Sequence, residues 1–160
     1  MLGSGRSLLD LSAYLAPERI CFLGRELGKQ VVLEQLAALA GQCPAVSDPA
    51  AFKAAIFDRE RVSSTGIGGG IAVPHAKIPS VRGFTMTVGV CRDGIEFQAK
   101  DQRPVRIIVM IAATDRERDT YLKVLATVAT TLKRPGVVEA VLAAEDAPTV
   151  IGALTSPAGV

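Results

Sequence analysis

A single histidine, His75, closes a glycine-rich stretch that begins at Ser63. The stretch reads Ser-Ser-Thr-Gly-Ile-Gly-Gly-Gly-Ile-Ala-Val-Pro-His, so a short apolar run leads directly into the imidazole. Imidazole can act as a base, a nucleophile or a metal ligand near neutral pH. Glycines bring backbone N–H groups close to a ligand, and concave runs of such groups bind anions, phosphate above all. These residue types in this order indicate chemistry on an anion beside a reactive imidazole.

Two structural explanations stay open from these residues alone. The glycines could serve only a tight connection between strands, since glycine runs are typical of turns. His75 could be a satisfied structural residue, as lone histidines often are. Pro74 favours a functional role, because it fixes the backbone and cannot donate to a sheet ladder. It places His75 at a strand end or edge, where α/β proteins carry their chemistry.

Common nucleotide and hydrolase motifs do not fit this stretch. No Gly-Lys-Ser/Thr sequence follows the glycines, and the third glycine of Gly-x-Gly-x-x-Gly would fall on Ile71. No Gly-x-Ser-x-Gly elbow surrounds Ser63 or Ser64, so a serine nucleophile is not indicated. The chemistry that fits is phosphoryl transfer through a phosphohistidine.

Arg59 is a second clue, upstream of the glycines. It continues by one helical step the apolar stripe of a helix predicted to begin at Asp48-Pro49. The planar fork of an inward-facing guanidinium suits an oxyanion such as phosphate. A neighbouring carboxylate, Asp58 or Glu60, is the alternative partner.

The composition describes an ordinary globular protein of one domain. The 160 residues are 49% hydrophobic and 21% charged. A net charge of +2 and an aromatic content of 4% disfavour nucleic-acid binding. The apolar runs are shorter than a membrane span, and the N-terminus lacks the apolar core of a signal peptide. We therefore expect a cytoplasmic protein without direct membrane insertion.

The cysteines Cys21, Cys43 and Cys91 are widely spaced and form no Cys-x-x-Cys pair. This pattern is typical of reduced thiols in a cytoplasmic protein rather than of a disulfide framework or a zinc site. With a single histidine beside them, we expect neither a bound metal nor another cofactor.

The hydrophobic pattern predicts helices, then strands, then helices. Strands are predicted around 19–23, at 71–73, 84–91 and 105–113, and helices at 32–41, from Asp48, from Thr114, from Val137 and at 148–154. This order favours an α/β domain with one mixed sheet. We expect a flexible leader at 1–7, a single domain at 8–155 and a frayed tail at 156–160.

Three local details accompany these elements. Residues 84–91 alternate between apolar and small or polar types, which predicts one better-buried face. Residues 105–113 are almost continuously apolar, which predicts a central strand covered on both sides. Asp93-Gly94 indicates a turn, and Thr114 with Glu117 has the spacing of a capping box.

The segment Arg59–Lys77 resembles the active-site signature of the fructose/mannitol-type (type 2) IIA domains of the bacterial phosphotransferase system (PTS, EIIA). That signature has Arg-Glu, a few further residues, then Ser-Thr-Gly-Ile-Gly-x-Gly-Ile-Ala-x-Pro-His. Within the family, the chain looks most like the nitrogen-regulatory type. The resemblance implies a single α/β domain whose mixed β-sheet is flanked by helices on both faces.

The resemblance also implies roles for individual residues. His75 would accept a phosphoryl group on Nε2 from phosphorylated HPr or the phosphocarrier of the nitrogen branch. Arg59 would stabilise the phosphoryl oxygens, and Ser64, Thr65 and the amide of Gly68 would line the site. No metal is needed. The surrounding surface should be shallow and apolar, because the donor must approach in line.

This chain departs from the family at one position. Many members carry a second histidine on the helix after the central strand, where this sequence has Tyr121. A tyrosine hydroxyl could hydrogen-bond the phosphoryl group or the imidazole but supplies no positive charge. Ordinary packing of Tyr121 on the helix is the favoured alternative.

Three functions therefore stay open at this stage. The leading hypothesis is a phosphohistidine protein of the nitrogen branch that regulates target proteins. The second is a sugar-specific IIA transferase that passes the phosphoryl group to a IIB partner. The third is a protein-interaction module that works without phosphorylation.

Overall fold

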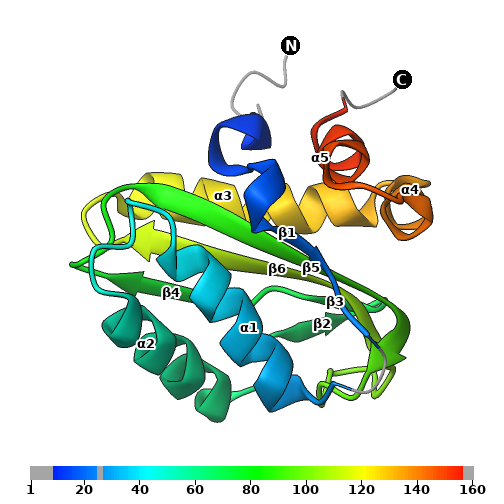
Figure 1. The fold of residues 1–160 in the computed structure, drawn as a ribbon, viewed down its shortest axis with the longest axis horizontal. Helices are drawn as coiled ribbons and strands as arrows, with labels where there is room; N and C mark the ends of the chain where they lie inside the picture. The colour runs from blue at the N-terminus through cyan, green and yellow to red at the C-terminus, as the bar shows by residue number, and fades with distance from the viewer. Residues whose placement is uncertain (1–8, 25–26, 157–160) are drawn as a thin grey trace.

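A six-stranded mixed sheet forms the middle layer of the molecule (Figure 1). Its order is β1-β5-β6-β3-β2, and β4 pairs with β6 beyond the end of β3. Pairs β1–β5, β3–β6 and β4–β6 are parallel, whereas β5–β6 and β2–β3 are antiparallel, so the predicted mixed sheet is confirmed. The strands are β1 (Ile20–Phe22), β2 (Gly66–Gly68), β3 (Ile71–Ala72), β4 (His75–Ile78), β5 (Phe84–Ile95) and β6 (Val105–Thr114).

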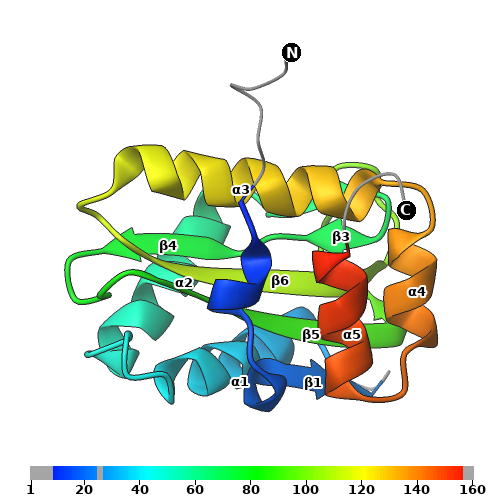
Figure 2. The same ribbon diagram turned by 90° about the horizontal axis from the view of Figure 1, so that it is seen from above.

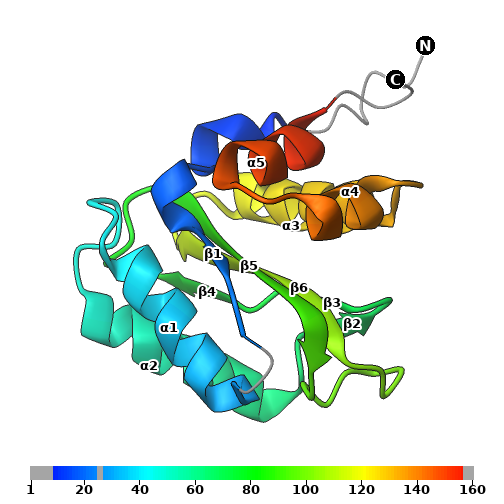
Figure 3. The ribbon, with the colours of Figure 1, turned by 45° about the vertical axis from the view of Figure 1, so that its right-hand side comes forward.

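Helices cover both faces of this sheet (Figures 2 and 3). The helices α1 (Lys29–Gly41) and α2 (Pro49–Val62) lie on one face. On the other face lie α3 (Arg118–Lys133), α4 (Val137–Ala143) and α5 (Ala147–Thr155). Short 3-10 turns, η2 (Leu11–Tyr14) and η3 (Pro17–Arg19), lead into β1.

The computed structural model describes residues 9–24 and 27–156. The predicted leader, 1–7, lies outside these residues, and of the predicted tail only Ser156 lies within them. Within the described ranges, no helix combines the length and the hydropathy that a membrane crossing requires.

The central strand β6 divides the core into two apolar clusters. Successive side chains of a strand point to opposite faces, so one strand feeds both layers. The residues of β6 are almost all buried, which confirms the predicted two-sided strand. Ile107, Val109 and Ile111 pack toward α3–α5, whereas Ile108, Met110 and Ala112 pack toward α1 and α2.

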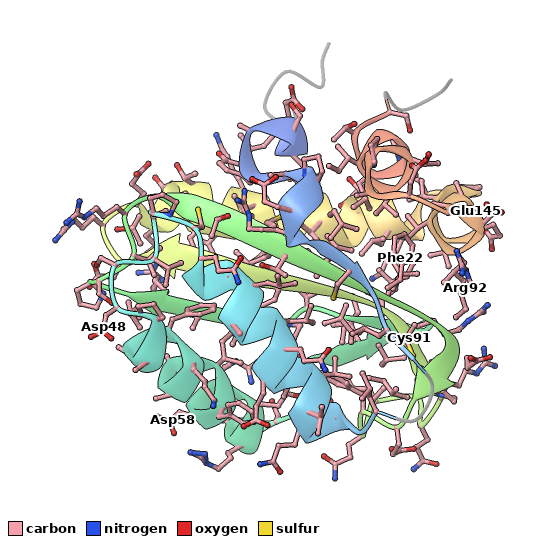
Figure 4. All side chains as sticks on the ribbon, in the orientation of Figure 1. Phe22, Asp48, Asp58, Cys91, Arg92 and Glu145 are labelled. Carbon is pink, nitrogen blue, oxygen red and sulfur yellow. The ribbon has the colours of Figure 1, made fainter. Side chains whose placement is uncertain are left out.

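The first two helices form where their sequences indicate. Asp48 caps α2 by accepting a hydrogen bond from the N–H of Ala51 at 3.1 Å, and Pro49 takes the first helical position. Asp48 and Asp58 mark the beginning and the last turns of this helix in Figure 4. The predicted stripe of α1 is buried, namely Val32, Leu33, Leu36, Ala37 and Ala40.

The strand β5 differs from its sequence pattern in two ways. The alternation predicted one better-buried face, yet Thr85 and Thr87 are as buried as their apolar neighbours. The reason is that α1 and α2 cover the face of the sheet on which these hydroxyls lie. The two threonines are therefore buried although their side chains are polar. The turn predicted at Asp93-Gly94 is also wrong, because β5 continues to Ile95 through an irregularity at which Gly94 has a φ of 81°.

The capping box predicted at Thr114 is wrong as well. Thr114 is the last residue of β6, paired with Ile78, and its N–H donates to the carbonyl of Gly83 at 2.8 Å. Its hydroxyl accepts a hydrogen bond from the N–H of Arg116 at 3.3 Å instead of capping a helix. Strand pairing thus holds Thr114 in the sheet, and α3 begins at Arg118.

At the far end of β5, Arg92 ties the sheet to α4 (Figure 4). Its guanidinium donates to the carbonyls of Leu142, at 2.7 Å, and Ala144. These carbonyls lie at the C-terminal end of α4, where a cation is favoured by the helix dipole. The same guanidinium lies 5.6 Å from the centre of the Phe22 ring. Arg92 therefore has a structural role.

Candidate active site

His75 is the first residue of β4, as Pro74 led us to expect. The Pro74 carbonyl accepts the N–H of Ile111 at 2.9 Å, which fixes the chain just before the histidine. The imidazole Nδ1 lies 2.8 Å from the carbonyl oxygen of Val73. Because a carbonyl oxygen can only accept, Nδ1 carries the hydrogen, and Nε2 keeps its lone pair. The backbone thus selects the tautomer in which Nε2 carries the free lone pair.

The surroundings of His75 also keep the ring uncharged. Burial holds the pKa of His75 below its usual value of 6.5, because a partly desolvated site disfavours the imidazolium. The Val73 carbonyl opposes this shift, the cation of Arg59 adds to it, and the anion of Glu60 opposes it. With a pKa below 6.5, the imidazole is predominantly neutral at pH 7, the state that nucleophilic attack requires.

A cavity of about 250 Å³ lies beside His75, between the end of α2, the glycine-rich stretch and α3. Its lining contains two cations, Arg59 and Lys100, and none of the carboxylates in the described part of the chain. Apolar side chains supply most of the exposed lining surface, so the predicted apolar character is found beside these two cations. The lining residues are Arg59, Ser63, Ser64, Thr65, Ile67, Val73, His75, Lys100, Leu125 and Ala129.

Arg59 reaches this cavity from the last turns of α2. The inward positions of this helix are Phe52, Ile56 and Glu60, so the expectation that Arg59 itself faces inward is wrong. Arg59 lies half-buried at the side of that stripe, because a step of four residues keeps the buried face in line. Its Nη1 donates to the carbonyl of Ser63 at 2.9 Å, and the structure brings it together with His75.

The carboxylates predicted as alternative partners of Arg59 are engaged elsewhere. Asp58 accepts from Arg61 at 2.6 Å, and Glu60 lies 2.9 Å from the ammonium of Lys29. Within the described ranges, Arg59 forms no ion pair. Its charge is therefore left to the cavity.

Glu60 supports the site without lining the cavity, a role that the sequence pattern did not identify. It is buried, with 8% of its surface exposed, and accepts hydrogen bonds from the N–H of Thr65 at 2.9 Å and from its hydroxyl at 2.7 Å. With Lys29, these contacts anchor the start of the glycine-rich stretch to α1 and α2. The sequence did contain a signal for this buried carboxylate, because Glu60 follows Ile56 by four residues and so lies on the same face of the helix.

Ser64 and Thr65 lie in the cavity lining, as predicted, but their hydroxyls already have partners. The Ser64 hydroxyl donates to the carbonyl of Phe97 at 2.8 Å and accepts the N–H of Gly66 at 3.1 Å. The Thr65 hydroxyl donates to Glu60. Both hydroxyl hydrogens are therefore committed to holding the loop in place.

Gly68 does not lie in the cavity lining, contrary to the expectation for its amide. It belongs to the hairpin between β2 and β3, where Gly68, Gly69 and Gly70 have φ values of 100°, 69° and 81°. Such positive values favour glycine, so these residues serve the turn. The N–H of Gly69 donates to the carboxylate of Asp101 at 2.9 Å, so that amide is occupied by a side chain of the protein itself.

Tyr121 lies beside His75, as the resemblance described above implied. The two rings are 6.0 Å apart between centres and inclined by 56°. The ammonium of Lys77 lies 5.1 Å from the centre of the Tyr121 ring, on the β4 side. Burial raises the pKa of Tyr121, so its hydroxyl stays neutral and supplies no charge to the site.

Lys100 is the second functional candidate that sequence reasoning missed. It lies on the connection between β5 and β6, and its N–H donates to the carbonyl of Gly66 at 3.2 Å. No periodic pattern or motif includes this lysine. Only the pairing of its loop with the glycine-rich stretch brings it to the cavity.

The described residues contain no cluster of metal-ligating side chains. Among residues 9–24 and 27–156, no group of at least three His, Cys, Asp or Glu side chains is arranged to hold an ion. The arrangement at His75 is instead a neutral imidazole beside unbalanced positive charge, which suits a transient anion.

The family of the chain follows from comparison with known proteins. The family described as phosphoenolpyruvate-dependent sugar phosphotransferase system, EIIA 2, matches residues 14–156. The chain belongs to this family, whose members are components of a phosphoryl-transfer system.

Individual relatives carry two kinds of name. A fructose-specific EIIABC component of the PTS from Bacillus subtilis is 36% identical over 123 residues, which are 77% of this chain but 19% of that protein. A fructose-specific EIIA component from Haloferax volcanii is 31% identical, with 88% of this chain and 92% of the relative covered. The crystal structure of nitrogen regulatory protein IIA-Ntr from Neisseria meningitidis superimposes with a TM-score of 0.81 at 26% identity, covering 89% of this chain and 97% of that one.

Proposed function

We propose that His75 accepts a phosphoryl group on Nε2 from phosphorylated HPr or the corresponding phosphocarrier of the nitrogen branch. The observation that carries this proposal is the hydrogen bond from Nδ1 to the Val73 carbonyl, 2.8 Å long, beside a cavity with two cations. This hydrogen bond leaves the lone pair of a neutral ring on Nε2, next to a cavity whose cations can bind an anion.

The transfer balances without a proton leaving His75. The lone pair of Nε2 attacks phosphorus as the bond between phosphorus and the donor's nitrogen breaks, and the donor nitrogen recovers its electron pair. The hydrogen stays on Nδ1, and the Val73 carbonyl that accepts its hydrogen bond stabilises the positive charge that develops on the ring. Arg59 would stabilise the phosphoryl oxygens, because fixed cations lower the barrier to phosphoryl transfer chiefly by electrostatics.

We assign Ser64, Thr65 and Glu60 to holding the loop rather than to the reaction itself. Their hydrogen bonds with each other and with neighbouring backbone support this assignment. Tyr121 would contribute ring packing beside His75. The protein would work in the cytoplasm, where the phosphocarriers act.

The output that we favour is regulation of target proteins according to the phosphorylation state of His75. The likeness to IIA-Ntr over 89% of this chain supports it. A second candidate is transfer onward to a IIB partner of a fructose- or mannitol-type system. The 36% and 31% identities with fructose-specific components support this candidate.

Intact-mass measurement tests the acceptor role. The protein is incubated with phosphorylated phosphocarrier and analysed under mildly alkaline conditions, with His75→Ala and His75→Gln as controls. We expect the mass of one phosphoryl group to be added to the parent and to neither variant. An unmodified parent would reject both transfer hypotheses and favour an interaction module that works without phosphorylation.

A second step separates the two outputs. The phosphorylated protein is mixed with a fructose-type or mannitol-type IIB domain, and loss of the added mass is followed over time. Retention of the phosphoryl group is the result expected for a regulatory protein. Rapid discharge to the IIB domain would favour the sugar-specific role instead.

A further inference from the structure

We propose that Lys100 is a second phosphoryl-binding residue, which contacts the group carried by His75 together with Arg59. This inference rests on the proposed function, and it assigns a role to a lysine outside the glycine-rich stretch. It begins from the charges that line the His75 cavity.

The cavity holds more positive charge than the protein itself balances. Arg59 and Lys100 both line it, and neither forms an ion pair within the described ranges. His75 adds no anion, and Tyr121 beside it stays neutral. A phosphoryl group brings about 1.5 to 2 negative charges at neutral pH, which one guanidinium balances only in part. A second cation at the same cavity completes the balance.

The place of Lys100 is fixed by its own loop. Its N–H donates to the Gly66 carbonyl at 3.2 Å, and the N–H of Gln102 closes a turn onto Ala99 at 2.9 Å. The next residue, Asp101, accepts the N–H of Gly69, so the loop is held to the hairpin at the lysine and at the residue that follows it. A side chain at Gly66 would lie 2.7 Å from the Cβ of Ala99, which shows how closely the two segments approach.

The other lysine near the site has a different setting. The ammonium of Lys77 lies over the Tyr121 ring, at 5.1 Å, and Lys77 is not in the cavity lining. Lys100 is exposed and long enough to follow a phosphoryl group that enters from a partner protein. Its flexible ammonium suits a group that is transferred rather than permanently bound.

Rapid-mixing kinetics with phosphorylated phosphocarrier provide the test. Single-turnover transfer is measured for the parent, Lys100→Met, Lys100→Arg and the matched control Lys53→Met. Lys53 is exposed and already lies 3.3 Å from the carboxylate of Glu34, outside the cavity. We expect Lys100→Met to be about 10- to 100-fold slower, the effect of one hydrogen bond to a charged group, and Lys100→Arg to keep most of the rate.

Salt separates contact from long-range attraction. At about 1 M salt the Debye length is about 3 Å, so steering of the donor is screened whereas a direct contact persists. A slow Lys100→Met variant at both low and high salt supports the inference. A defect that disappears at high salt, or a rate equal to that of Lys53→Met, overturns it while the acceptor role of His75 stands.

A measurement without the donor keeps the two proposals distinguishable. Inorganic phosphate is titrated while the ring signals of His75 are followed by NMR in the parent and in Lys100→Met. We expect the phosphate-dependent shift to weaken in the variant. If the parent is never phosphorylated by the donor, the proposed function fails. The phosphate titration still tests Lys100 by itself, because an equal shift in the parent and in Lys100→Met overturns its role in binding the phosphoryl group. Thermal unfolding of each variant checks that the fold is retained, with Lys100→Gln as a second substitution.

Discussion

Two hollows flank the last turns of α2, and they differ in how their charges are balanced. The larger, about 590 Å³, faces α1 and is lined by Lys29, Gln30, Leu33, Phe57, Glu60, Arg61, Glu96 and Gln98. Its cations have partners, since Lys29 pairs with Glu60 and Arg61 with Asp58. In the smaller His75 cavity, Arg59 and Lys100 have no carboxylate partner within the described ranges. Size therefore does not distinguish the candidate site, whereas unbalanced charge beside a neutral nucleophile does.

Glu60 links the two hollows, although it lines only the larger one. Glu60 pairs with Lys29 on the α1 side and accepts two hydrogen bonds from Thr65 on the side of the glycine-rich stretch. The balanced hollow thus supports the loop that shapes the unbalanced one. Substitutions on the two sides should have different consequences, for transfer on one side and for stability on the other.

The largest difference should appear between Arg59 and Arg61, two arginines that are two residues apart on α2. We expect Arg59→Met to slow phosphoryl transfer about 100- to 1,000-fold, the usual loss when one fixed donor to a developing charge is removed. Arg61→Met removes an exposed pair and should leave the rate within about twofold. Rapid-mixing assays measure both. Equal effects of the two substitutions on the transfer rate would contradict the proposal that only the His75 cavity binds the phosphoryl group.

Glu60 should matter most for stability. Glu60→Gln leaves Lys29 without its anion, and breaking a buried pair in this way costs about 3–5 kcal/mol. We expect about 2 kcal/mol in urea unfolding, because 19% of the Lys29 side chain is exposed and water compensates in part. Adding Lys29→Met to Glu60→Gln should recover part of the loss. A single substitution without effect would show that the pair does not hold the loop.

The titration of His75 should respond to the cation of Arg59, although burial is the larger cause of its lowered pKa. Its folded pKa lies below 6.5, so the folded protein binds the proton less well than the unfolded chain. Stability from this group is therefore present above pH 6.5 and is lost as the pH falls through the lowered pKa, together with the nucleophile. Arg59→Met should raise the pKa, because its cation disfavours the imidazolium. NMR of the ring signals measures this shift, and a fall would contradict the assigned cause.

Tyr121 should give the smallest effect. Its ring lies 6.0 Å from that of His75, so Tyr121→Phe keeps the packing and loses the hydroxyl alone. We expect transfer to change by no more than about twofold, below the roughly tenfold that a lost neutral hydrogen bond can cost. A tenfold loss in single-turnover kinetics would instead place the hydroxyl on the phosphoryl group.

Much of the fold was predictable because its signals are local. The helix α2 begins at the cap and proline that its sequence shows, and α1 ends at Gly41 as predicted but begins at Lys29, before the predicted 32. The strand β6 is buried on both sides, as its continuous apolar run predicts. Errors arose where tertiary packing overrode a local pattern. Threonines alternate along β5 yet are buried beneath α1 and α2, and Thr114 stays in the sheet rather than capping α3.

The candidate site shows the same division. By itself the sequence determined the imidazole, the glycine hairpin and the helix that carries Arg59, because each depends on neighbouring residues. Only the tertiary structure decided that Lys100 joins them, that Glu60 pairs with Lys29, and that Gly68 stays out of the cavity. The physical reason is that charge balance depends on distances between atoms, and these charges come from segments that only folding brings together.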